Sequence, residues 1–153
     1  MTTTMTVDMN FEVDAKAVRT DCPDGDCLEN QPLPPAIAAR PIADKSPAEW
    51  AYERMVLYIQ KFEEMLDGDQ EVAMGFAGSD AGTLHIQGMG YFAPDIITFY
   101  GVGPDGAKTQ LVQHVSQLSV VLRAAPKVDA DKEANRIGFQ MREKLEKGDT
   151  APS

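Results

Sequence analysis

One capped amphipathic helix constrains the fold of this chain more than any other feature of the sequence. Ser46 stands before Pro47 at the first helical position, and Glu49 follows three residues after the serine, which is the pattern of a capping box. Apolar residues then recur at helical spacing up to Gly68, a natural stop. This stripe consists of Ala51, Met55, Tyr58, Ile59, Phe62, Met65 and Leu66. A helix of about 21 residues and about 32 Å must bury such a stripe against a sheet or another helix.

After the helix the apolar residues change to a period of two, which predicts strands. We expect four of them, over residues 70–78, 83–88, 95–102 and 107–115. Small and acidic residues predict turns at 79–82 and at Gly103–Gly106, and residues 89–94 are expected to form a loop. Such short connections indicate an antiparallel meander.

The third of these strands predicts two different faces. Ile97 and Phe99 share one face, which we expect beneath the helix, whereas Ile96, Thr98 and Tyr100 share the other. A face that presents aromatic and polar groups can mediate dimerisation or ligand stacking.

Two later segments are ambiguous between helix and strand. Residues 116–126 carry apolar side chains at helical spacing and end at Pro126, which predicts a short helix. Residues 135–141 are predicted as a final strand. The alternative is a helix through Leu145, which Gly138 would weaken by about 1 kcal/mol relative to alanine.

These elements predict an α+β fold with a long N-terminal helix packed on a mainly antiparallel sheet of four to five strands, plus a short second helix. The domain is expected over residues 46–141, after an extended, Pro-rich acidic arm over 1–45 and before a charged tail over 142–153. Because the prolines of the arm remove backbone donors and no periodic apolar face accompanies them, we expect the arm to add little to the core.

Charge and length narrow the function classes. The 153 residues carry a net charge of −10, and residues 1–45 and 46–70 contribute −4 each. Without a basic stripe, binding to nucleic acid is not expected, because Lys and Arg must neutralise phosphates. No apolar run approaches the length of about 20 residues that a membrane span needs, and the N-terminus lacks the apolar core of a secretory signal. We therefore expect a cytoplasmic protein with no membrane contact.

The cysteines and histidines give a weak case for metal or cofactor chemistry. Cys22 and Cys27 form a single C-x4-C pair around a turn, whereas structural zinc needs two pairs of ligands, so free thiols are expected. His85 and His114 both fall on predicted strands and would share a site only if the second and fourth strands lie close together. We predict no resident metal, no cofactor and no catalytic residue, because the sequence offers no evident pair of nucleophile and base.

Candidate ligand or interface residues are nevertheless present. Arg54 and Arg136 either pair with carboxylates such as Glu53 and Asp95, or hold a small anionic ligand. Aromatic rings supply surfaces for stacking. The complete set of candidates is Trp50, Arg54, His85, Asp95, Tyr100, His114 and Arg136.

Several blocks of the chain carry a resemblance to a known family. They are SPAEWAYERMVLYIQKFEEMLD at 46–67, GYFAPDIITFYGVGPDGAKTQLVQHVSQLSVVLRAAPK at 90–127, and RIGFQM at 136–141. Together they resemble an uncharacterised domain-of-unknown-function family of short bacterial and phage proteins. The resemblance implies a domain over roughly 46–141 and a bacterial or phage origin, but it brings no catalytic residues.

Three functions follow as hypotheses. The first is a non-enzymatic binding or interaction module that self-associates as a homo-oligomer, with the Pro-rich arm available to a protein partner. The alternative is a phage-type anti-defence protein that sequesters a small nucleotide signal, with Trp50 or Tyr100 for stacking and Arg54 or Arg136 for phosphate. The second alternative is a small metal-assisted hydrolase that uses His85 and His114.

Overall fold

The predicted amphipathic helix is α3, Pro47–Glu63, in the computed structural model, which describes residues 14–77 and 82–147. The hydroxyl of Ser46 accepts a hydrogen bond from the backbone N–H of Glu49 at 3.1 Å, so the predicted N-terminal cap is present. Ala51, Met55 and Ile59 are buried in the core, which confirms the central part of the apolar stripe, whereas Met65 is 55% exposed beyond the end of the helix. The helix has 17 residues, about four fewer than expected.

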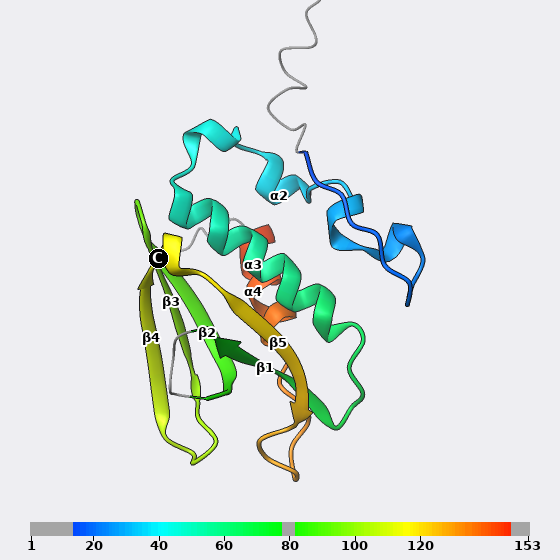
Figure 1. Cartoon of the computed structure of the whole chain (residues 1–153), viewed down its shortest axis with the longest axis vertical. Helices are drawn as coiled ribbons and strands as arrows, with labels where there is room; N and C mark the ends of the chain where they lie inside the picture. Colours follow the sequence, from blue (N-terminus) through cyan, green and yellow to red (C-terminus); the bar gives the residue numbers. More distant parts are fainter. Residues whose placement is uncertain (1–13, 78–81, 148–153) are drawn as a thin grey trace, which may run out of the picture.

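A five-stranded sheet lies beneath α3 (Figure 1). Its strands are β1 Gln70–Phe76, β2 Leu84–Phe92, β3 Ile96–Val102, β4 Lys108–His114 and β5 Val120–Pro126. Their spatial order is β4-β3-β2-β1-β5, and every neighbouring pair is antiparallel. The predicted α+β class and antiparallel sheet are therefore confirmed.

The two faces of β3 are those that its alternation predicts. Ile97 and Phe99 are fully buried, and the Phe99 ring packs 4.8 Å from that of Phe76. Tyr100 is 42% exposed on the opposite face. We call the face opposite α3 the outer face of the sheet. Because the hydrophobic core lies on the inner face, side chains on the outer face remain available for contacts with other molecules.

The connections of the meander are confirmed in part. Gly106 donates its N–H to the carbonyl of Gly103 at 3.0 Å and has a φ of +83°, so the predicted turn before β4 is present. The turn predicted at 79–82 lies, except for its last residue, outside the described residues. The loop predicted over 89–94 is wrong, because β2 continues to Phe92 and places Met89 and Tyr91 on the inner face.

The short helix predicted over 116–126 is a strand instead. Only Val115–Gln117 form a 3-10 turn, η4, and residues 120–126 form β5, paired with β1 along its whole length. Val120 and Leu122 pack on the core, while Val121 is 59% exposed. The apolar residues of this segment fit both the helical period and the strand period. The strand forms because the backbone groups at the free edge of β1 need hydrogen-bond partners.

The strand predicted over 135–141 is also wrong, since residues 137–146 form helix α4, Ile137–Glu146. Its N-terminus packs against the end of α3, where the buried carboxylate of Glu63 accepts hydrogen bonds from the N–H groups of Gly138 and Phe139, both at 3.1 Å. Ile137 and Met141 enter the core. A cap supplied by another helix satisfies donors that the local sequence leaves open.

The arm contributes to the core more than its composition predicts. It contains the short helices η1 Asp24–Asp26, η2 Leu28–Asn30, α2 Pro35–Ala38 and η3 Ile42–Asp44. Cys27 and Ile37 are 1% and 2% exposed. Cys22 and Cys27 do not form the local disulfide that their spacing would allow, and Cys27 lies in a packed segment.

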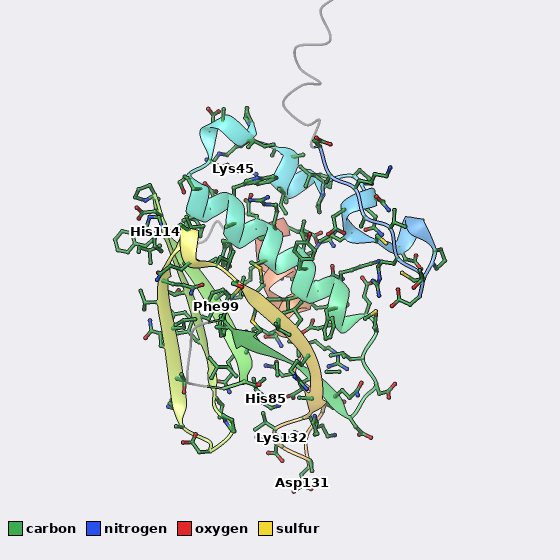
Figure 2. The ribbon with its side chains drawn as sticks, viewed as in Figure 1. Lys45, His85, Phe99, His114, Asp131 and Lys132 are labelled. Atoms are coloured by element: carbon green, nitrogen blue, oxygen red, sulfur yellow. The ribbon has the colours of Figure 1, made fainter. Side chains whose placement is uncertain are left out.

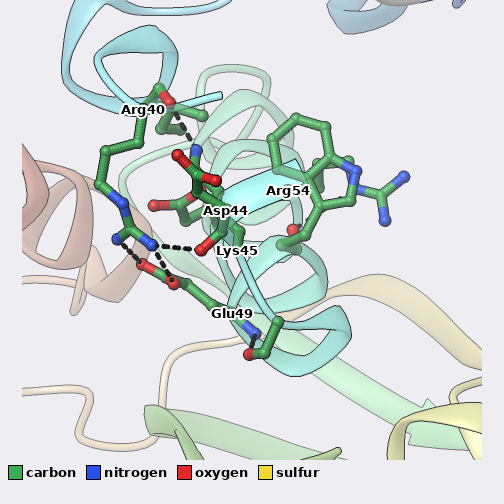
Figure 3. A network of polar contacts seen from close by, with 9 residues as sticks. Arg40, Asp44, Lys45, Glu49 and Arg54 are labelled. Carbon is green, nitrogen blue, oxygen red and sulfur yellow. Dashed lines mark hydrogen bonds and ion pairs between the residues drawn. The ribbon is translucent and has the colours of Figure 1, made fainter. Parts of the chain in front are cut away.

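Ionic contacts hold the end of the arm to α3 (Figure 3). Lys45 Nζ lies 2.7 Å from Glu53 Oε1, and both side chains are at least nine-tenths buried. Arg40 donates to both carboxylate oxygens of Glu49, at 2.8 and 3.2 Å, and to the carbonyl of Asp44 at 2.8 Å. The buried carboxylate of Glu53 on α3 thus depends on Lys45 of the arm for its partner, because an unpaired buried charge is strongly destabilising.

Candidate functional site

The predicted site residues lie in three separate places. Trp50 and Arg54 are together on α3, and Arg136 directly precedes α4. The remaining four lie on or beside the sheet: His85, Asp95, Tyr100 and His114.

The two histidines do not share a site. Strand β3 separates β2 from β4, and His85 pairs with Val102 whereas His114 pairs with Ile96, at opposite ends of β3. Six residues of strand amount to about 20 Å, and Figure 2 shows the two rings far apart. His85 Nε2 lies 2.9 Å from the carbonyl oxygen of Pro126. Within 14–77 and 82–147 no group of three or more His, Cys, Asp or Glu residues has the geometry to hold a metal ion.

His114 instead joins a local cluster that the sequence did not suggest. Its Nε2 lies 3.3 Å from Asp95 Oδ2, and its Nδ1 lies 2.8 Å from the hydroxyl of Ser116. This order of groups is that of a carboxylate, a base and a nucleophile. However, Nδ1 also accepts the backbone N–H of Ser116 at 3.0 Å, and His114 and Asp95 are nearly half exposed. We interpret the cluster as the cap of η4, since water reaches every member.

Arg136 has a structural role. It donates to the carbonyl oxygens of Gln70 at 2.7 Å and Asp67 at 2.9 Å, and thereby ties the start of α4 to the segment before β1. The prediction that it pairs with a carboxylate is therefore wrong about the partner. Backbone carbonyls occupy its terminal donors, so we do not include it in a ligand site.

The outer face of the sheet is the first candidate surface. Figure 1 shows α3 on one side of the sheet with no helix on the other. Phe92 and Val112 are 75% and 57% exposed there, and the ring of Tyr100 lies across Gly88 and Gly90, within 4 Å of the position that a Cβ atom would take at each. The two glycines resemble loop signals in the sequence, but here they leave room for an aromatic ring.

A cavity of about 400 Å³ between the arm and α3 is the second candidate. Trp50, Arg54 and Tyr58 line it from the helix, while Leu28 and Leu33 line it from the arm. The guanidinium of Arg54 lies 4.7 Å from the centroid of the Trp50 ring, so the structure brings these two predicted residues together. Lys45 Nζ is also 4.9 Å from that centroid.

Tyr58 belongs to the apolar stripe predicted to be buried, but it faces this cavity and is 38% exposed. Its hydroxyl donates a hydrogen bond to the carboxylate of Glu29 on the arm. Partial burial, together with this hydrogen bond and the negative charge of Glu29, raises the pKa of Tyr58 to about 12. Only the docking of the arm creates this contact, so the helical pattern could not reveal it.

A family of unknown function (DUF6173) matches residues 42–140 of the chain. The chain belongs to this family. The match confirms the resemblance seen in the sequence and nearly coincides with the domain expected over 46–141. No curated protein and no solved structure matches the chain.

The family match includes the whole of one candidate surface but only part of the other. All strands of the outer face lie within the DUF6173 region, so this surface belongs to the family domain. The cavity has one wall inside that region, on α3, and its other wall at residues 14–33, outside the match. None of the helices described in the structure is long and apolar enough to cross a membrane.

Proposed function

We propose that the protein is a non-enzymatic interaction module that self-associates through the outer face of its sheet. The observation that carries this proposal is the exposure of Phe92, Val112 and Tyr100 on a face that no helix covers. Large apolar side chains gathered on one open face are typical of protein interfaces.

The charge distribution supports a second copy as the partner. The outward positions of β2, β3 and β4 carry a single formal charge at neutral pH, that of Lys108, and those of β1 and β5 add the opposite charges of Glu71 and Arg123, in a chain whose net charge is −10. Two copies can therefore meet through this face with little electrostatic repulsion. Contact through the acidic surfaces of the arm or of α3 would instead bring like charges of the two copies together. Depletion of charge is also the compositional mark of an interface core.

The area of the face sets the strength of the association. Four strands of seven residues and one of nine present a projected area of about 590 Å², whereas a stable interface buries about 800 Å² of accessible surface per partner. Protruding side chains add to the flat area, so the second copy must cover most of the face. We expect a symmetric dimer of micromolar affinity.

Light scattering coupled to size-exclusion chromatography tests the proposal. The native protein is expected to shift from monomer to dimer over about 5 to 200 µM, the range that brackets a micromolar constant. The substitution Val112→Lys places a charge in the face and should weaken the dimer at least tenfold, because a lysine there must lose its hydration on association. Val128→Lys is the matched control, since Val128 is equally exposed, at 55%, but follows the end of β5. A native protein that stays monomeric throughout, or equal effects of the two substitutions, would contradict the proposal.

A further inference from the structure

The cavity between the arm and α3 has the properties of a small-molecule site. Its volume of about 400 Å³ is within the range of about 300–1,000 Å³ that is usual for ligand pockets. Trp50 and Met55 on α3, Leu28 and Leu33 on the arm, and Leu118 after η4 supply a mostly apolar wall. Three segments that are distant in sequence therefore enclose one apolar space.

Arg54 gives this space a polar end. It is exposed at the edge of the cavity, and its only hydrogen bond among the described residues is from Nε to the carbonyl of Trp50, at 3.4 Å. Arg40, Arg136 and Arg142, by contrast, each donate a terminal nitrogen to an oxygen at 2.7 or 2.8 Å. The two terminal nitrogens of Arg54 are thus available to an acceptor, and the nearby Trp50 ring helps to hold the guanidinium in place.

The acidic groups of the cavity limit the charge of its ligand. Asp14 and Glu29 contribute two negative charges to the lining and Arg54 contributes one positive charge. The carboxylate of Glu29 already accepts the Tyr58 hydroxyl. Every anion meets this lining of net charge −1, but a phosphate dianion is repelled more strongly than a single carboxylate, whose one charge matches that of the Arg54 guanidinium.

We propose that this cavity binds a small amphipathic carboxylic acid. The carboxylate accepts hydrogen bonds from the terminal nitrogens of Arg54 at the mouth, and the apolar body lies against Met55 and Leu118. The site is separate from the outer face, so it does not depend on self-association. The same lining disfavours a nucleotide with several phosphate charges more than it disfavours a single carboxylate.

Isothermal titration of the full chain with decanoate tests the proposal. We expect saturable binding of decanoate, binding at least fivefold weaker for the neutral analogue decanol, and no binding of adenosine monophosphate. Arg54→Gln should weaken decanoate binding about five- to tenfold, because it removes a partly exposed, charge-assisted contact. Arg123→Gln is the matched control, since it removes the same charge from an exposed site on β5.

A second variant addresses the apolar end. Leu118→Glu places a carboxylate beside the ligand and should weaken binding more than tenfold, with circular dichroism to verify that the variant is folded. Backbone amide shifts on adding decanoate should change at Leu28, Leu33 and Leu118. The proposal is overturned if decanoate does not bind, if decanol binds equally well, if Arg54→Gln behaves as Arg123→Gln, or if the shifts change only on the outer face.

Discussion

Replacing Gly138 with alanine sets two physical effects against each other. Helix propensity alone predicts that an alanine in α4 stabilises the protein by up to about 1 kcal/mol. The structure predicts the opposite sign, because a Cβ atom at this position would lie 2.6 Å from the backbone nitrogen of Gln60 and 2.8 Å from its Cα. Both atoms belong to the backbone of α3 and cannot rotate away.

The size of the loss follows from the separation that the two helices would need. Ordinary contact begins at 3.4 Å, so α4 would have to move by about 0.8 Å away from α3. That movement also stretches the hydrogen bonds from Gly138 and Phe139 to Glu63, which are 3.1 Å long. Overpacking of this kind costs about 1–3 kcal/mol, and weakening the cap adds part of another hydrogen bond. We expect a net destabilisation of about 2 kcal/mol after the gain in propensity.

Thermal and urea unfolding monitored by circular dichroism measure this difference. For a chain of this length, 2 kcal/mol corresponds to a fall in Tm of about 4 to 8 °C. Gly75→Ala is the control, because a Cβ atom there would lie 4.0 Å from Val121 Cβ, an ordinary contact, and should be neutral or mildly stabilising. If Gly138→Ala is as stable as the native protein or Gly75→Ala, the close approach of α3 and α4 does not limit this site and the argument is refuted.

Two further predictions concern Glu63. Glu63→Ala leaves the N–H groups of Gly138 and Phe139 without their acceptor and should lower the free energy of unfolding in urea by about 3 kcal/mol. Glu64→Ala is the control, since this side chain is 41% exposed and its loss should change stability by less than about 0.5 kcal/mol. Similar values for the two variants would contradict the role of Glu63 as a cap. Burial also raises the pKa of Glu63, and the two backbone N–H groups and Arg136 only partly offset that effect. The folded state therefore holds this proton more tightly than the unfolded state, and its contribution to stability is complete below about pH 4.3, the unfolded pKa, and is lost as pH rises through the folded pKa. The stability of the native protein relative to Glu63→Gln should consequently decrease as pH is raised from about 4, by at most about 1.4 kcal/mol per unit; an increase would show that ionised Glu63 is the favoured form in the fold.

Local signals were sufficient for α3 and for the faces of β3. The cap at Ser46 and the apolar stripe are both encoded within one helix, and they agree with each other. The alternation that separates Phe99 from Tyr100 is likewise local, so burial follows once a helix covers one face. The family resemblance was also readable from the chain itself, because it depends on residue identity alone.

The candidate sites were readable only in part. Trp50 and Arg54 were recognised as residues suited to binding, but their cavity needs the docked arm as its second wall. His85 and His114 were grouped by residue type, and the strand order then placed them at opposite ends of β3. Composition cannot predict such distances, because strand order is a long-range property.

Local residue patterns are sufficient to predict the capped helix, the antiparallel alternation and membership of the family. Tertiary structure decided the rest: that 120–126 is a strand, that 137–146 is a helix, and that the arm packs on α3. In these segments local preferences differ by about 1 kcal/mol or less per residue. Pairing with the free edge of β1 and capping by Glu63 each involve partners far away in the chain, and Lys45 is buried against Glu53, eight residues on, where the end of the arm packs on α3. Satisfying buried polar groups of that kind outweighs local preference, since leaving one without a partner costs about 1–3 kcal/mol.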